Sequence, residues 1–278
     1  METVVSTAVS VAVARGVLRL TAPNPSLMTG PGTNSYVVGE SECAVLDPGP
    51  DIEVHVERLV AAAPGPIRWI VLTHTHPDHS PAAMRLKAAT GAMIVGRAAP
   101  EDGRQDTATR IDRLVRDEEF VGARGHELQA ITTPGHASNH VCWLHAASGF
   151  LFSGDHILNG STTVILPPDG DMAAYLLALE RLRRLPLNAI APGHGDVIRD
   201  PVAAIDALIA HRLRREAKVF ERLHAAGEVT LDELVARVYD DVSPALHGWA
   251  RFSLEAHLIK LERERRARRT GDRWTAIG

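Results

Sequence analysis

The chain has 278 residues, 45% of them hydrophobic, which suffices for one large domain, or a large and a small one, with an ordinary core. Its net charge of -4 argues against a protein coated with nucleic acid over its whole surface. Cys43 and Cys142 form no CxxC pair and indicate buried, reduced thiols rather than a disulfide framework. No stretch approaches the roughly 20 apolar residues of a membrane span, and residues 1–14 lack the features of a signal peptide. We therefore expect a cytoplasmic protein with no membrane partner.

The first part of the chain predicts strands followed by a helix. Apolar and β-branched residues alternate over residues 9–20 and 34–46, which indicates an antiparallel meander. Helical spacing follows over residues 51–62, with Asp51 as the expected N-cap. The next expected elements are a strand at 67–72, a helix at 81–89 and a strand at 92–95.

The same order of elements recurs further along the chain. The expected strands lie at 127–132, 140–145 and 149–153, followed by a helix at 171–184 and a strand at 187–191. Two such halves fit a pair of packed sheets with helices outside them.

The character of the sequence changes near Pro201. One apolar stripe marks a long helix from Val202, and shorter helical patterns follow near residues 231–238 and 243–266. A strand is expected at 273–275, after a turn that contains glycine. Helices followed by a basic hairpin resemble a small winged-helix module, so we divide the chain into domains at residues 1–204 and 205–278.

The densest group of chemically active side chains follows the strand at 67–72. The segment reads Thr73-His74-Thr75-His76-Pro77-Asp78-His79-Ser80. Burying these polar groups without partners would cost roughly several kcal/mol, so packing does not explain them. His74 and His76 share one face of an extended segment, whereas Asp78 and His79 follow Pro77 and turn toward a second point nearby. This spacing is typical of a metal site.

Three later segments share one layout, in which an apolar strand is followed by glycine beside a possible ligand. They end in Pro134-Gly135-His136, Ser153-Gly154-Asp155 and Pro192-Gly193-His194. Glycine lets the backbone turn tightly and approach an ion without a side chain in the way. His136, Asp155 and His194 are therefore further candidate ligands.

The motifs HxHxDH, PGH, GD and PGHG, in this order, resemble the metallo-β-lactamase superfamily over about residues 10–200. The resemblance implies an α/β protein, with an αββα sandwich as the catalytic domain at 1–204 and a small, mostly helical, winged-helix-like domain at 205–278. It assigns one ion to His74, His76 and His136, a second ion to Asp78, His79 and His194, and a bridging position to Asp155. Asp47 matches the family's aspartate at an early strand end, which supports the site.

This ligand set implies a hydrolase with a dinuclear site. Two divalent ions, with zinc as the first choice and manganese or iron as alternatives, would lower the pKa of a bridging water toward neutrality. The bridging hydroxide would then be the nucleophile. We expect Asp78 and His79 to carry catalysis, because Asp78 binds metal, faces the nucleophile and can orient it or relay its proton.

The substrate is less constrained than the metal site. Segments that include Gly30-Pro31-Gly32-Thr33-Asn34-Ser35-Tyr36 resemble the β-lactamase-like protein 2 group, whose relatives include a single-strand endoribonuclease and polyketide thioesterases. We expect a small molecule of the ester or thioester type, which needs an apolar pocket and a polarised carbonyl. Single-stranded RNA is the alternative, because residues 263–273 contain six arginines. A regulator that binds nucleic acid or a partner through the C-terminal module is a further alternative, and the oligomeric state is left open.

Overall fold

The computed structural model describes residues 10–278, so the start of the first predicted strand, at Val9, lies outside the described residues. The described chain forms two compact units. The first comprises residues 10–132, 139–162 and 186–201, and the second comprises residues 133–138, 163–185 and 202–278. The domain boundary after residue 204 stays a prediction.

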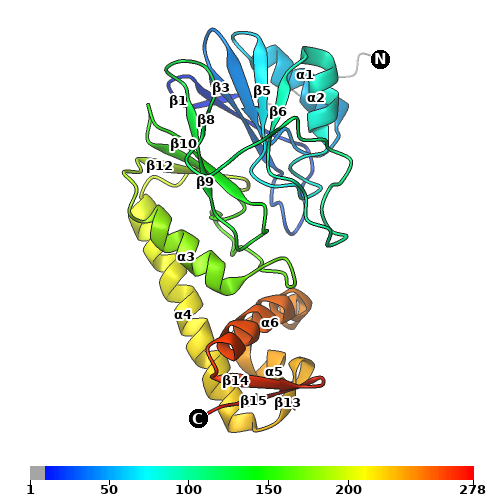
Figure 1. Cartoon of the computed structure of the whole chain (residues 1–278), viewed down its shortest axis with the longest axis vertical. Helices are drawn as coiled ribbons and strands as arrows, with labels where there is room; N and C mark the ends of the chain where they lie inside the picture. Colours follow the sequence, from blue (N-terminus) through cyan, green and yellow to red (C-terminus); the bar gives the residue numbers. More distant parts are fainter. Residues whose placement is uncertain (1–9) are drawn as a thin grey trace. The chain divides into compact units, whose positions relative to one another are not determined.

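A seven-stranded mixed sheet dominates the first unit (Figure 1). Its strands, in spatial order, are β1 (Val11–Ala14), β2 (Val17–Thr21), β3 (Asn34–Gly39), β4 (Cys43–Leu46), β5 (Ile67–Val71), β6 (Met93–Gly96) and β7 (Arg113–Leu114). Strands β1 to β4 pair antiparallel, whereas β4, β5 and β6 pair parallel. Parallel pairing brings the carboxyl ends of β4 and β5 to one edge of the sheet. Asp47 and Thr73, which follow these strand ends, therefore lie close together.

A second, five-stranded mixed sheet belongs to the same unit. Its spatial order is β12 (Ala189–Pro192), β11 (Phe150–Gly154), β10 (Val141–His145), β9 (Leu128–Thr132) and β8 (Phe120–Val121). Strands β11 and β12 pair parallel, whereas the other pairs are antiparallel. Because β11 and β12 are parallel, Asp155 and His194, which follow their carboxyl ends, lie at the same edge of this sheet.

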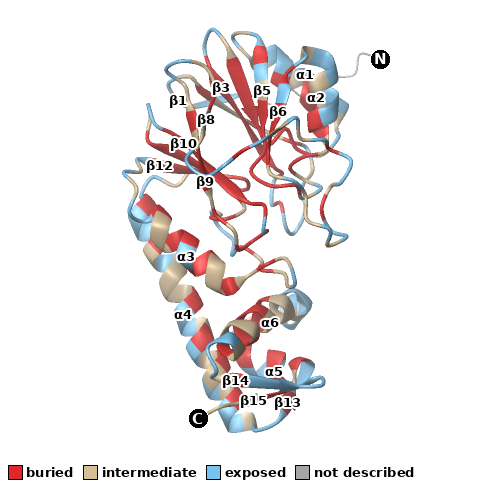
Figure 2. Ribbon diagram, in the orientation of Figure 1, coloured by how far each residue is buried: buried red, intermediate tan, exposed pale blue. Residues whose placement is uncertain are grey.

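The two sheets pack face to face through one apolar core. Tyr36 and Leu46 of the first sheet share this core with Trp143 and Phe152 of the second. The other face of the seven-stranded sheet packs against α1 (Glu53–Ala62) and α2 (Ala82–Thr90), through residues such as Leu59 and Leu86. Every residue of β3 is buried, because alternate side chains of this strand point into the two cores (Figure 2).

One expectation about a helix start is wrong. Helix α1 begins at Glu53 with Ile52 as its N-cap, and no side chain caps it. Asp51 instead accepts a hydrogen bond of 2.6 Å from Arg85 of α2. The Asp51 carboxylate, which local spacing predicted to cap α1, is therefore hydrogen-bonded to the Arg85 guanidinium instead.

The second unit is mostly helical. It contains α3 (Met172–Leu182), α4 (Pro201–Ala226), α5 (Leu231–Val238), the short 3-10 helix η1 (Pro244–Leu246) and α6 (His247–Arg263). Three short strands form a sheet in the order β13 (Val229–Thr230), β15 (Arg273–Ala276) and β14 (Ala267–Thr270). Trp274 of the hairpin is buried with Leu234 and Leu258 in the core of this region, so the expected helices and basic hairpin are confirmed.

The described residues contain no helix that is a candidate for crossing a membrane. No helix in the range 10–278 is both long enough and apolar enough to span a bilayer. The cytoplasmic location stays a prediction.

Candidate metal centre

Asp47, directly after β4, ties two strand ends together. Its residue is 3% exposed, and its carboxylate accepts hydrogen bonds from the backbone nitrogen of Thr73 (2.8 Å) and from Thr73 Oγ1 (2.6 Å). The backbone of Asp47 has a φ of 44°, in the left-handed region that few residues other than glycine adopt. Such a conformation persists where the surrounding contacts determine it, and here it aims the carboxylate at the start of the histidine loop.

The same carboxylate orients His79, which is completely buried. Asp47 Oδ2 lies 2.9 Å from His79 Nδ1. Because an ionised carboxylate only accepts hydrogen bonds, Nδ1 carries a hydrogen and the ring presents Nε2 on its other side. His79 Nε2 lies 3.2 Å from Asp155 Oδ1 and 3.5 Å from Asp78 Oδ2.

Four predicted ligands form what we call the mixed group: Asp78, His79, Asp155 and His194. One ligand atom from each lies within 4.8 Å of the others. His194 Nε2 is 3.2 Å from Asp78 Oδ2 and 3.3 Å from Asp155 Oδ1. Two carboxylates and two imidazoles that converge in this way are a donor set suited to a divalent cation.

The electrostatics of the mixed group favour positive charge between the carboxylates. Burial opposes ionisation of Asp155, but His194 and His79 hold the pKa of this carboxyl well below its usual range. For Asp78 too, the neighbouring His79 and His194 outweigh burial and lower the pKa. Burial alone would lower the pKa of His194, yet the Asp155 and Asp78 carboxylates raise it to about 9, and the pKa of His79 also lies well above its ordinary value. A divalent cation bound between these carboxylates would supply the same compensating positive charge.

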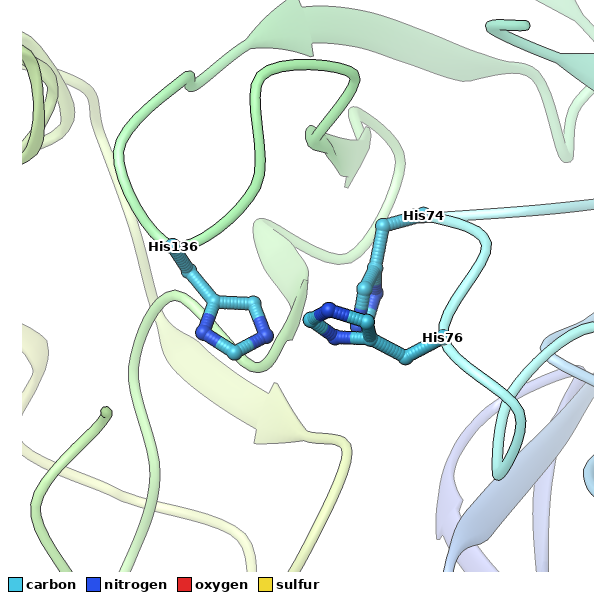
Figure 3. A group of neighbouring side chains, drawn as sticks. All are labelled: His74, His76 and His136. Atoms are coloured by element: carbon cyan, nitrogen blue, oxygen red, sulfur yellow. The ribbon is translucent and has the colours of Figure 1, made fainter. Parts of the chain in front are cut away.

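The other three predicted ligands, His74, His76 and His136, form the histidine group (Figure 3). One ring nitrogen from each lies within 4.8 Å of the others. His136 Nδ1 lies 2.8 Å from the carbonyl oxygen of Val164, so this nitrogen donates and leaves Nε2 as the ligand atom. Three converging imidazoles suit zinc and other first-row metals.

The structure thus brings all seven predicted ligands into two compact groups. Asp155 lies in the mixed group, and its bridging position between two ions stays a prediction. The catalytic roles of Asp78 and His79 and the metal roles of the seven side chains likewise stay predictions.

The structure shows a steric reason for glycine at position 193 that the sequence did not reveal. Its backbone does not adopt a positive φ. A Cβ at this position would lie 2.7 Å from Asp155 Oδ1 and 2.8 Å from His79 Cε1. Glycine here leaves room for the side chains of two predicted ligands, Asp155 and His79.

Gly193→Ala is therefore expected to displace Asp155 and His79 and to weaken zinc binding by about 10-fold or more. Zinc affinity can be measured by competition with a chromophoric chelator. Gly248→Ala in α6 is a matched control, because a Cβ there meets nothing within 4 Å. Equal zinc affinities for the two variants would contradict the crowding argument.

A polar network that the sequence did not reveal holds Thr75, the residue between His74 and His76. Thr75 Oγ1 donates to Gln105 Oε1 at 2.8 Å and accepts from Asn139 Nδ2 at 2.7 Å. All three residues are buried. Gln105 lies in a stretch without periodicity, so no local signal connects it to the site.

Comparison with known proteins agrees with the architecture. Residues 28–194 match the Metallo-beta-lactamase superfamily, and residues 230–274 match the Beta-lactamase associated winged helix domain. The chain is 31% identical over 270 residues to the Beta-lactamase-like protein 2 homolog of Drosophila melanogaster, which covers 91% of this chain and 89% of that protein. It is 33% identical over 217 residues to Thioesterase pkgB of Emericella nidulans, which covers 76% of this chain and 60% of that protein.

A solved structure gives the same result for the fold. The crystal structure of a Beta-lactamase domain protein from Burkholderia ambifaria superposes with a TM-score of 0.82 at 20% identity, covering 99% of this chain and 96% of that one. The predicted α/β fold, with two mixed sheets followed by a small helical region that ends in a hairpin, is confirmed.

Proposed function

This chain belongs to the metallo-β-lactamase superfamily and carries a winged helix domain, and we propose that it is a dinuclear metal-dependent hydrolase of small-molecule thioesters. The observation that carries the proposal is the convergence of seven side chains with nitrogen and oxygen donor atoms into two groups. The similarity to Thioesterase pkgB supports the thioester as substrate class. We assign one ion to the histidine group and one to the mixed group, with zinc as first choice and manganese or iron as alternatives.

Bound ions of this kind lower the pKa of water and polarise a carbonyl oxygen. The chain itself supplies orientation and proton transfer. Asp47 holds the His79 ring, and Thr73 holds Asp47. The Asp78 side chain is 29% exposed and that of Asp155 is 14% exposed, so Asp78 is the more accessible carboxylate. Asp78 is therefore our choice for the group that takes a proton from the attacking water and passes it to the leaving sulfur.

The contacts of the C-terminal arginines favour a small molecule over RNA. Four of the six arginines between residues 263 and 273 lie beside carboxylates of the same unit, which offset part of their positive charge. The pairs are Arg263 with Asp171, Arg266 with Glu216 and Glu264, Arg269 with Glu255, and Arg273 with Glu228. A track that binds RNA needs cations available to phosphates.

A substrate panel tests the proposal. Zinc-loaded protein is offered acyl-CoA and glutathione thioesters, lactones and labelled single-stranded RNA. We expect thioester hydrolysis that His79→Ala and a strong chelator each abolish. RNA cleavage that His79→Ala abolishes would instead establish the endoribonuclease. Nucleic-acid binding with no hydrolysis of any substrate would favour the regulator.

A further inference from the structure

We propose that Arg212 and Arg263, in the helices around the winged-helix region, are positioning residues for His136. The inference rests on the proposed metal role of His136. It extends the function of the second unit, because this unit would set the orientation of one metal ligand. All the contacts in the following argument lie within the second unit.

The His136 loop, residues 133–138, is held by a neighbouring stretch that we call the supporting segment, residues 163–171. His136 Nδ1 donates to the Val164 carbonyl at 2.8 Å. The backbone nitrogen of Ser138 donates to Asp169 Oδ2 at 3.0 Å, and that of Asp171 donates to the Gly135 carbonyl at 2.8 Å. The orientation of the His136 ring therefore depends on where the supporting segment lies.

Arg212 of α4 holds the first residue of the supporting segment. Arg212 is only 3% exposed, and its Nη2 donates to the carbonyl oxygen of Thr163, next to Val164. Its guanidinium carbon also lies 5.3 Å from the centroid of the Tyr175 ring. A buried arginine is costly unless its contacts compensate for lost hydration, and here these contacts are made to the supports of the His136 loop.

Tyr175 extends the same support to Gly135. Tyr175 is completely buried in α3. A Cβ on Gly135 would lie 2.5 Å from Tyr175 Cα, and Gly135 has a φ of 147°. The His136 loop thus rests directly on the helix whose aromatic ring Arg212 covers.

Arg263 of α6 holds the other end of the supporting segment. It forms an ion pair with Asp171, whose Oδ1 accepts from the backbone nitrogens of Ala173 and Ala174 and so caps α3. Lys260, one turn earlier in α6, lies 2.9 Å from Glu216 Oε2 of α4. This contact, in which Glu216 is buried and Lys260 is half-buried, joins the helix of Arg263 to the helix of Arg212.

The two arginines therefore fix the supporting segment from two helices. Loss of either contact would let the Val164 carbonyl move, and the hydrogen on the His136 ring would no longer be restricted to Nδ1. Arg212 contacts Thr163 and Tyr175, and Arg263 contacts Asp171, so these contacts support His136, and the mixed group should be unaffected.

The test compares Arg212→Met, Arg263→Met and Arg212→Lys in the full-length chain. Arg215→Met is the matched control, because Arg215 lies one turn along α4 and holds Asp241 and the Val238 carbonyl instead. Zinc is titrated against a chelator, and the ring nitrogens of His136 are followed by NMR in the metal-free and the zinc-loaded protein. In the parent chain we expect the hydrogen on Nδ1.

We expect Arg212→Met and Arg263→Met to weaken one zinc-binding step by about 10- to 100-fold and to give His136 a mixture of tautomers. Arg212→Lys should restore part of both signals, because lysine can still donate to Thr163. Lowered thermal stability with an unchanged His136 tautomer would overturn the proposal, as would equal effects of Arg212→Met and Arg215→Met. Neither readout uses a substrate, so failure of thioester hydrolysis is distinguishable from failure of this inference.

Discussion

Asp155→Asn is expected to remove one metal ion and to slow thioester hydrolysis by about 1000-fold or more, corresponding to the loss of several kcal/mol of transition-state stabilisation. Asparagine has nearly the same shape as aspartate, so the change removes charge rather than volume. Asp155 Oδ1 lies 3.2 Å from His79 Nε2 and 3.3 Å from His194 Nε2. Without this carboxylate the mixed group loses the charge that attracts a cation.

Metal analysis and hydrolysis rates check this expectation together. The parent chain should bind close to two zinc ions, and Asp155→Asn should bind one or fewer. Asp196→Asn is the matched control, because the exposed Asp196 lies two residues after His194 and pairs with Arg19 at 3.0 Å. A His76→Ala, Asp155→Ala double variant that still bound both ions would refute the ligand assignment.

Asp47→Asn is expected to weaken zinc binding by about 10- to 100-fold and to lower the free energy of unfolding by about 1–3 kcal/mol. The asparagine amide can accept from the Thr73 backbone, but its NH₂ group faces Thr73 Oγ1 and His79 Nδ1. To avoid two opposed donors, His79 would have to move its hydrogen to Nε2, the nitrogen that faces the other ligands. A protonated Nε2 cannot bind metal.

The Asp47→Asn substitution tests the hydrogen bond to His79 without changing the strain of the backbone at position 47. Asparagine adopts the left-handed conformation more readily than most residues, so the φ of 44° at this position is retained. Urea unfolding gives the stability, and chelator competition gives the zinc affinity. Asp112→Asn is the control. Asp112 also accepts a hydrogen bond from a backbone nitrogen, that of Ile94 at 2.8 Å, but it is neither a predicted ligand nor a described partner of one. Unchanged zinc affinity in Asp47→Asn would remove Asp47 from the site.

The local elements were predictable because each depends on neighbouring residues. Alternation predicted β9, β10 and β11 within one residue of their observed bounds. Helical spacing predicted α4 and α5, since one apolar stripe suffices to identify an amphipathic helix. The N-cap at Asp51 was wrong because Arg85, distant in sequence, bonds the same carboxylate.

The candidate ligands were also accessible from the sequence, because strand ends and glycines mark them locally. His74, His76, Asp78 and His79 lie within one loop, and the other three follow glycine at later strand ends. Their grouping was accessible only through the family resemblance. The placement of Asp155 beside His194 required the parallel pairing of β11 and β12, and its placement beside His79 required the packing of the two sheets.

The sequence by itself determined the kinds of element, the candidate ligands and the superfamily, because periodicity, glycine positions and motif spacing are properties of adjacent residues. Only the tertiary structure decided that Asp47 orients His79, that Gly193 leaves room for Asp155, and that Arg212 holds the segment behind His136. Each of these contacts joins residues from separate parts of the chain. Their hydrogen bonds and close approaches depend on how strands pair and helices pack, which no local pattern records.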